Sequence, residues 1–347
     1  MKKTREVKVG NLSIGGGHPI AVQSMLNRDP HDVSVCVAQA LELQAAGCEI
    51  IRTTVPDLES VSVIDALKKE VSVPIVADIH FDYRIALACA EHGVDKIRIN
   101  PGNIGDDDRV GQVARACKQR QIPIRIGVNS GSLEKHILQK YGAPTAQALV
   151  ESAKYHARLL EKFDFEDIVI SIKSSDVRRT VEAYRLLSED CPYPLHLGVT
   201  EAGTESMGIV KSSIGIGALL LDGIGDTIRV SLTADPVREV LTGKRILRAL
   251  GLGKPAVNIV SCPTCGRTKI DLISLANAVE EKLADCPKDI TVAVMGCVVN
   301  GPGEAREADL GVAGGDGCGL IFRKGEILRK VPETQLLDVL MEEIEKI

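Results

Sequence analysis

The segments PIVADI (residues 74–79), KIRIN (96–100) and PIRIGV (123–128) decide the fold. Each is a short run rich in β-branched residues, and a helical pattern separates it from the next run. Similar runs recur through the first two thirds of the chain. The eight runs are Ile20–Ser24, Glu49–Val55, Pro74–Ile79, Lys96–Asn100, Pro123–Val128, Asp167–Ile172, Pro194–Val199 and Asp226–Ser231.

Eight strand–helix units predict an α/β fold, a parallel (β/α)8 TIM-type barrel, with a doubly wound open sheet as the alternative. We expect a short hairpin before the first unit, at Val7–Val9 and Leu12–Ile14, and two helices inserted after the fifth strand. The clearest helical patterns are Val33–Ala46, Arg84–His92, Leu133–Tyr141, Thr145–Lys162, Val177–Ser188 and Pro236–Leu250.

Cationic side chains stand at or near the carboxyl ends of several strands, where barrel active sites are built. They are Arg52, Arg98, Arg125, Lys173 and Arg229. Burying several cations without anions is costly, and Arg binds phosphate oxygens in a bidentate manner. The pattern therefore favours a site for a diphosphate, although any single cation could instead pair with a carboxylate or face outward.

The segment Gly251–Pro255 reads as a linker between a barrel, residues 1–250, and a smaller α/β domain, residues 256–347. In the smaller domain we expect strands at Val257–Val260, Ile290–Met295, Leu310–Ala313 and Leu320–Arg323, and helices at Asp271–Leu283 and Glu333–Glu345.

This smaller domain carries CPTCGR at residues 262–267 and MGCVVNGPGE at 295–304. The thiolates of Cys262, Cys265 and Cys297 suit a 4Fe-4S cluster, and Glu304 would be an exchangeable fourth ligand on the iron that a substrate reaches. Structural zinc, with Cys286 or Cys318 as a fourth thiolate, and a thioredoxin-like dithiol at Cys262 and Cys265 are alternatives.

The composition excludes several classes of protein. The net charge is −5 and charges of both signs are mixed, which argues against binding to nucleic acid or to a membrane surface. No signal peptide and no apolar run of membrane-spanning length is evident, so we expect a cytoplasmic protein whose ten cysteines are thiols or metal ligands.

The short linker also predicts an oligomer. The last barrel helix runs back to the amino-terminal face, whereas the active site lies at the other face. About six to eight linker residues span at most roughly 25 Å, which is too little to bring the cluster round to its own barrel. A head-to-tail homodimer with two shared sites would solve this.

The cysteine motifs, together with VQSM (22–25), ADIHF (77–81), RINPGNIG (98–105), RIGVNSGS (125–132) and LGVTEAG (197–203), resemble the 4-hydroxy-3-methylbut-2-enyl diphosphate synthase family of the non-mevalonate isoprenoid pathway. The resemblance covers nearly the whole chain. It is closest to the two-domain bacterial form, since there is no room for the extra domain of the plant-type members.

The resemblance implies a two-electron reductive ring opening and dehydroxylation of 2-C-methyl-D-erythritol 2,4-cyclodiphosphate. It further implies one 4Fe-4S cluster per subunit and electrons from flavodoxin or ferredoxin. The implied cluster ligands are Cys262, Cys265, Cys297 and Glu304, and the implied acid–base group is Glu201. The implied substrate-binding residues are Arg52, Asp78, His80, Arg98, Asn100, Arg125, Asn129, Lys173, Arg229 and Ser231.

Two other classes of function remain open on the residues alone. One is a non-redox lyase or aldolase whose carboxyl-terminal domain holds structural zinc. In such an enzyme Lys173 would form a Schiff base with a phosphorylated metabolite. A non-catalytic iron–sulfur sensor would use the cysteine motifs without turnover.

Overall fold

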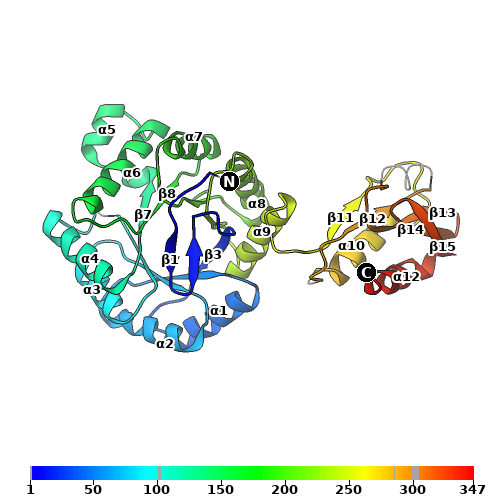
Figure 1. Cartoon of the computed structure of the whole chain (residues 1–347), viewed down its shortest axis with the longest axis horizontal. Coiled ribbons are helices and arrows are strands. Elements are labelled where there is room, and N and C mark those ends of the chain that lie inside the picture. Colours follow the sequence, from blue (N-terminus) through cyan, green and yellow to red (C-terminus); the bar gives the residue numbers. More distant parts are fainter. Residues whose placement is uncertain (1, 101–102, 285, 299–304) are drawn as a thin grey trace. The chain divides into compact units, whose positions relative to one another are not determined.

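The computed structural model describes residues 2–100, 103–284, 286–298 and 305–347. The chain divides into two compact units, residues 1–252 and 253–347, which are coloured blue to yellow and yellow to red in Figure 1. Each unit has its own hydrophobic core. Among the described residues, no helix is both long and apolar enough to cross a bilayer.

The first unit is a barrel of parallel strands, as predicted. The strands are β3 (Ala21–Met25), β4 (Ile50–Thr54), β5 (Ile75–Asp78), β6 (Lys96–Ile99), β7 (Ile124–Asn129), β8 (Ile168–Lys173), β9 (His196–Leu197) and β10 (Thr227–Ile228). Their hydrogen-bonded order is β8-β7-β6-β5-β4-β3-β10-β9. A parallel bridge between Ile170 and Leu195 brings the two ends of this order together, so the sheet is nearly closed and the open-sheet alternative is wrong.

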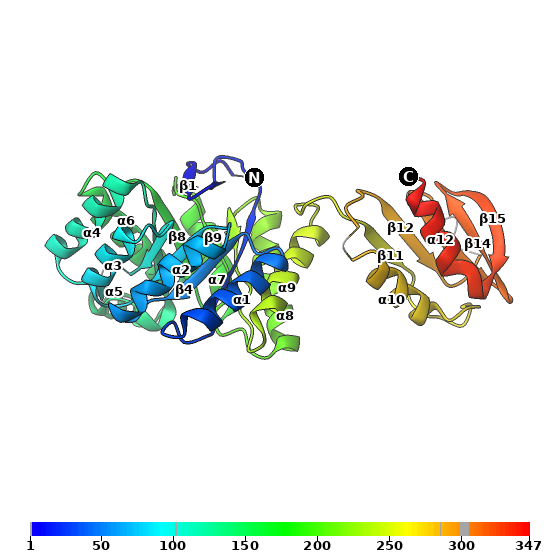
Figure 2. The same ribbon diagram turned by 90° about the horizontal axis from the view of Figure 1, so that it is seen from below.

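Helices surround this barrel (Figures 1 and 2). They are α1 (Val33–Ala45), α2 (Ser62–Glu70), α3 (Tyr83–Glu91), α4 (Asp107–Arg120), α5 (Lys135–Tyr141), α6 (Ala146–Glu161), α7 (Val177–Ser188), α8 (Glu205–Leu221) and α9 (Pro236–Ala249). Aspartate side chains cap the amino termini of several of them, including Asp32 on α1 and Asp235 on α9. The inserted helices α5 and α6 confirm the expected insertion after β7.

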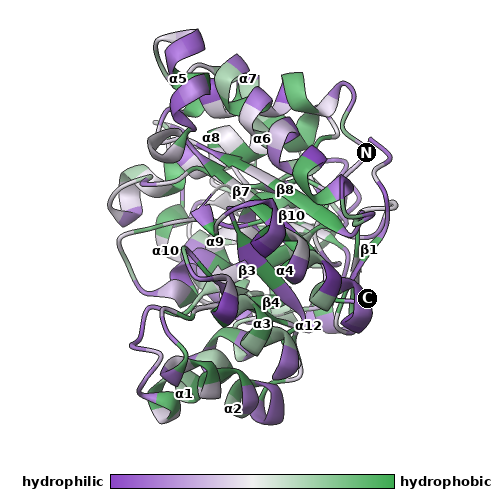
Figure 3. Cartoon of the chain, turned by 90° about the vertical axis from the view of Figure 1, so that its left-hand side faces the viewer, coloured by the Kyte–Doolittle hydropathy of each residue, from purple (hydrophilic) through white to green (hydrophobic). Residues whose placement is uncertain are grey.

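Alternate residues of the strands face the helices or the barrel interior. Ile97 and Ile99 of β6, for example, belong to the core between strands and helices, whereas Arg98 faces inward. Figure 3 shows green, hydrophobic strand ribbons near β8 and β10, and hydrophilic patches on the surrounding helices.

The hairpin of β1 (Val7–Val9) and β2 (Leu12–Ile14) covers the amino-terminal end of the barrel. Val7, Val9 and Ile14 are buried in one cluster with Ala21, Ile50, Val76 and Val169, which lie at the starts of their strands. The floor of the barrel is therefore apolar and closed. Polar chemistry is left to the carboxyl ends of the strands.

The described residues of the second unit form a five-stranded sheet with two long helices. Its strands are β11 (Asn258–Ser261), β12 (Thr291–Met295), β13 (Leu310–Gly315), β14 (Cys318–Arg323) and β15 (Glu326–Pro332), and its helices are α10 (Leu272–Lys282) and α12 (Leu336–Glu345). The first three strands are parallel and the last two pair antiparallel. The expected strands and helices are present, and β15 is a strand that the sequence pattern did not predict.

Candidate active site

The structure gathers the five strand-end cations inside the barrel. Arg98, Arg125 and Lys173 are buried, and the side chains of Arg52 and Arg229 are only 13% and 19% exposed. Glycines on neighbouring strands give these long side chains room. A β-carbon at Gly127 would collide with the guanidinium of Arg98, and one at Gly198 would lie 2.9 Å from Nζ of Lys173.

Asp78, at the end of β5, connects two of these cations. Its Oδ2 accepts from Nη2 of Arg52 at 2.8 Å and its Oδ1 from Nη1 of Arg98 at 3.1 Å. Burial alone would raise the pKa of this carboxyl. The charges of Arg52 and Arg98, with smaller contributions from His80 and Arg125, outweigh burial and hold the pKa well below its usual range. Asp78 is therefore a permanent anion of the site.

Glu239 of α9 is a second buried carboxylate, and sequence reasoning missed it. It lies 3.3 Å from Nη2 of Arg229 and also accepts hydrogen bonds from the hydroxyl of Ser24 and the backbone N–H of Leu232. Acidic residues are common in the first turn of a helix, because their negative charge interacts favourably with the positive end of the helix dipole. Nothing in the sequence pattern distinguished Glu239 from an exposed residue of that kind.

The remaining two cations lack a carboxylate partner in the described part of the chain. The Nε and Nη1 atoms of Arg125 have no hydrogen-bond partner there. Nζ of Lys173 lies 3.4 Å from Nε2 of His196, whose Nδ1 lies 2.8 Å from the hydroxyl of Thr227. Burial, followed by the charges of Arg229 and Arg125, lowers the pKa of Lys173 well below its ordinary value.

Positive charge is thus in excess inside the barrel. Each buried ion loses several kcal/mol of hydration that only an opposite charge can offset. The five strand-end cations face two carboxylates among the described residues. The arrangement can bind a polyanion such as a diphosphate, whose oxygens would satisfy the free guanidinium donors of Arg125.

The other predicted site residues lie around this cluster. Asn100 is buried just after β6, Asn129 and Ser231 are half-buried, and His80 is exposed, with its Nε2 3.8 Å from Asp78. Glu201 is exposed and has a φ of 51°, a left-handed conformation that is uncommon outside glycine. Such backbone strain is often found at functional sites.

The second unit brings two of the predicted cluster thiols to one edge. Strands β11 and β12 are adjacent and parallel, with Ser261 opposite Val294, so Cys262 and Cys297 both follow the carboxyl ends of neighbouring strands. The N–H of Gly296 donates to Sγ of Cys262 at 3.2 Å. Cys265 is exposed on the loop after Cys262.

These residues fit a thiolate-bound cluster in their chemistry. Hydrogen bonds from Arg267, its backbone first and its side chain second, lower the pKa of Cys265 and so favour the thiolate that binds iron. No three potential metal ligands are grouped within the described segments. Glu304, the predicted fourth ligand, lies outside the described residues.

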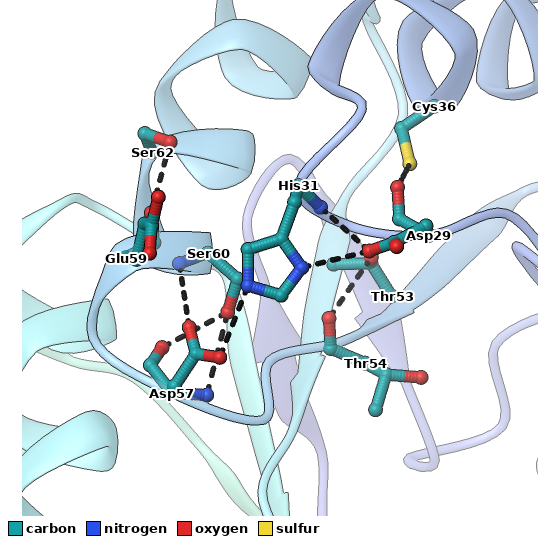
Figure 4. Close-up of polar contacts among 9 residues, drawn as sticks. All are labelled: Asp29, His31, Cys36, Thr53, Thr54, Asp57, Glu59, Ser60 and Ser62. Carbon is teal, nitrogen blue, oxygen red and sulfur yellow. Dashed lines mark hydrogen bonds and ion pairs between the residues drawn. The ribbon is translucent and has the colours of Figure 1, made fainter.

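A separate polar cluster joins the loops after β3 and β4 (Figure 4). Nδ1 of His31 lies 2.7 Å from Oδ1 of Asp29 and its Nε2 lies 3.0 Å from Oδ2 of Asp57. Asp57 also accepts from the N–H of Ser60 at 2.9 Å, so it orders the short helix that follows. These two loops follow β3 and β4, and β4 carries Arg52.

Comparison with protein families matches both units. Residues 4–244 match the model of the GcpE TIM-barrel domain and residues 258–346 that of the GcpE protein C-terminal domain. The chain is 59% identical over 346 residues to 4-hydroxy-3-methylbut-2-en-1-yl diphosphate synthase (flavodoxin) of Clostridium perfringens, covering 100% of this chain and 99% of the relative. It is 60% identical to the protein of the same name from Caldanaerobacter subterraneus subsp. tengcongensis, covering 99% and 97% of the two chains.

Solved structures similar to the chain share its fold alone. Dihydropteroate synthase of Burkholderia cenocepacia aligns with a TM-score of 0.51 at 14% identity and covers 72% of this chain and 98% of its own. A phospho-2-dehydro-3-deoxyheptonate aldolase of Thermotoga maritima aligns with a TM-score of 0.50 at 13% identity, covering 72% and 75% of the two chains.

The substitution Asp78→Asn tests the charge balance of the barrel. It leaves Arg52 and Arg98 buried without their shared anion, so we expect the free energy of unfolding to fall by about 3–5 kcal/mol in urea. Asp190→Asn is the matched control, because Asp190 pairs with Lys154 on the surface, where such pairs contribute up to about 1 kcal/mol. Equal losses in the two variants would contradict the assignment.

The cluster of His31 makes a pH-dependent connection between the two loops. Hydrogen bonds to Asp29 and then to Asp57 raise the pKa of His31. Because the pKa is raised in the folded state, the stabilisation is present at low pH and is lost as pH rises through that raised value.

An NMR titration of the His31 ring should therefore show a pKa above the ordinary value of about 6.5. Asp29→Asn should lower it. Asp32→Asn, which removes a nearby charge that caps α1 without bonding His31, should change it little. An equal decrease in both variants would show that general charge, and not the hydrogen bond, sets the value.

Proposed function

The chain belongs to the GcpE family of 4-hydroxy-3-methylbut-2-en-1-yl diphosphate synthases, oxidoreductases of isoprenoid biosynthesis, and we propose that it converts 2-C-methyl-D-erythritol 2,4-cyclodiphosphate to the linear hydroxybutenyl diphosphate. The reaction opens the cyclic diphosphate and releases one substrate oxygen as water. Written with the uncharged acids, it consumes two electrons and two protons. Membership of this family displaces the lyase alternative, in which Lys173 forms a Schiff base.

The excess of buried positive charge in the barrel is the observation that carries this proposal. A cyclic diphosphate would offer its oxygens to Arg125 and to the cations already shared with Asp78 and Glu239. Charge-assisted hydrogen bonds of this kind contribute roughly 1.5–3 kcal/mol each. The residues proposed to bind or shape the substrate are Arg52, Asp78, His80, Arg98, Asn100, Arg125, Asn129, Lys173, Arg229 and Ser231.

We assign the acid–base role to Glu201. It follows β9 at the carboxyl end of the barrel, and its left-handed backbone turns the loop sharply at that position. A carboxyl group there can deliver the proton that lets the departing hydroxyl leave as water. In this proposal Glu201 would act on the departing hydroxyl, while the cations hold the phosphates.

In the second unit, Cys262, Cys265 and Cys297 would hold one 4Fe-4S cluster per subunit, with Glu304 as an exchangeable fourth ligand. The cluster would pass single electrons to the substrate when bound. Cys262 and Cys297 follow adjacent parallel strands, and the N–H of Gly296 donates a hydrogen bond to Sγ of Cys262, which would orient it toward the cluster. The relatives' names support flavodoxin as the electron donor, and ferredoxin is the other candidate. All ten cysteines are free, as in a reducing cytoplasm.

We also propose a head-to-tail homodimer, and helix α8 offers a surface for it. Met207, Val210, Ile214 and Leu221 are 54%, 48%, 56% and 76% exposed and form an apolar stripe along this helix. Ile214 lies seven residues from both Met207 and Leu221. An antiparallel pair of α8 helices around a twofold axis at Ile214 would therefore place Met207 of one copy on Leu221 of the other, as an isologous contact requires.

The cluster is tested by anaerobic purification with iron and sulfide analysis, where about four of each per chain are expected. Glu304→Cys should keep the iron but lose most turnover, because a fourth thiolate does not yield its place to a substrate oxygen. Cys318→Ala, outside the proposed ligand set, should keep both. A colourless protein with stoichiometric zinc would refute the proposal.

The dimer is tested by Ile214→Asp, with mass and activity measured together by light scattering and turnover with a reductant. We expect a monomer that has lost most activity, because each barrel site needs the other subunit's cluster. Leu41→Asp, at an isolated exposed leucine of α1, should remain a dimer. A fully active monomer would contradict shared sites.

A further inference from the structure

Lys96 is a buried lysine that the proposed mechanism does not use. It is the first residue of β6, fully buried, and Nζ has no hydrogen-bond partner among the described residues. Arg98 lies two residues further along the same strand and faces the barrel interior, so Lys96 faces it too, one layer closer to the floor. Ile97 and Ile99 take the opposite face.

The charged groups around Lys96 are mostly positive. Arg125 of the adjacent strand β7 and Arg52 of β4 act on it, and Arg98 lies above it on its own strand. His196 of β9 adds no charge, because burial, followed by the charges of Arg125 and Lys173, lowers its pKa well below the ordinary value. The carboxylate whose charge favours a charged Lys96 is that of Asp95, which already accepts from Nζ of Lys68 and from the N–H of Ile75, at 2.7 Å and 2.8 Å. Asp78 of the adjacent strand β5 is bound by Arg52 and Arg98. Below Lys96 the interior is closed by the apolar hairpin cluster.

Arginine and lysine respond differently to this crowding. A guanidinium keeps its proton in proteins, whereas a buried ammonium readily gives its proton up. Burial, followed by the charges of Arg125 and Arg52, lowers the pKa of Lys96 well below its ordinary value. Where no anion is bound, the least costly arrangement is four charged arginines above a neutral Lys96.

A diphosphate bound to the arginines would reverse that balance. Its negative charges would lie one layer above Lys96, in an interior of low dielectric constant where charges interact strongly. The cost of a charged amine beneath them would fall. A proton from the solvent would then return to Nζ without any bond between Lys96 and the ligand.

We propose that Lys96 couples binding of the diphosphate to uptake of a proton, so that the barrel interior adjusts its own charge to that of its ligand. This inference rests on the proposed function, because it needs a polyanion at the arginines. Lys96 is a positioning residue in this scheme, since it acts on the substrate through the field around Arg52, Arg98 and Arg125. Its role differs from that of Lys173, which ends β8 and belongs to the residues proposed to bind the substrate.

The experiment is isothermal titration of the anaerobic, cluster-loaded full chain without reductant. The ligands are the cyclic diphosphate and, separately, inorganic pyrophosphate. Each titration is run in buffers of different ionisation enthalpy, so that the number of protons taken up is obtained from the dependence of the observed heat on the buffer. The proteins are the wild type, Lys96→Met and the control Lys69→Met, which makes the same change at an exposed lysine of α2.

We expect the wild type and Lys69→Met to take up protons, and Lys96→Met to take up about one fewer per ligand. Uptake of a proton also means that affinity falls as pH rises. Between the pKa values of Lys96 in the free and in the ligand-bound protein, log affinity should therefore fall less steeply with pH in Lys96→Met than in the wild type, by a slope of about one.

Folding provides a second readout. Removing a buried amine without a partner should leave the melting temperature equal or raise it, because a methionine of similar length fits an apolar floor. If Lys96→Met lowers the melting temperature and keeps the wild-type proton count, Lys96 is a packing residue and the inference is wrong. Lys96→Gln, also uncharged, should show the same reduced uptake if the methionine variant does not fold.

The outcomes separate this inference from the proposed function. Binding of either diphosphate with no difference in proton uptake between the wild type and Lys96→Met overturns the role of Lys96 and leaves the proposed function standing. If neither diphosphate binds the wild type, both the proposed diphosphate site and the coupling through Lys96 are refuted.

Discussion

The structure depends on one electrostatic constraint, namely that a nearly closed barrel encloses more cations than carboxylates. Asp78 and Glu239 each serve arginines, but Arg125 and Lys173 have no carboxylate partner among the described residues. A protein interior tolerates such an imbalance only where an anion binds or where a group can discharge. We therefore attribute both the proposed substrate choice and the proposed proton uptake to the same shortage of negative charge.

Much of the fold could be predicted because its sequence pattern is local. Short β-branched runs alternate with capped helices, and closure into a barrel follows from their number. Strand β15 was missed because five of its first six residues are solvent-exposed, including Ile327 and Leu328, so it lacks the alternation that marks a half-buried strand. Its pairing with β14 comes from the sheet and not from its own pattern.

The candidate site was less predictable, because pairing across the fold leaves no local pattern. Glu239 lies on α9 and reaches Arg229 and Ser24 only after the barrel closes. The alternation of KIRIN does place Lys96 on the face of Arg98, so its inward direction was available from the sequence. Its lack of a partner was not, since that depends on Asp95 being bound by Lys68. The loop cluster of Asp29, His31 and Asp57 likewise joins segments that are separate in the sequence.

The hairpin β1–β2 has a kinetic consequence. Because Val7, Val9 and Ile14 pack on the first inward residues of several strands, the described residues close the amino-terminal end, and we expect solutes to reach the arginines from the carboxyl end of the barrel. Substrate and product of the proposed reaction would then enter and leave at the same end of the barrel. A product that keeps its diphosphate would prevent the next substrate from binding until it dissociates. The hydrogen bonds that would select the substrate would therefore also limit the rate of product release.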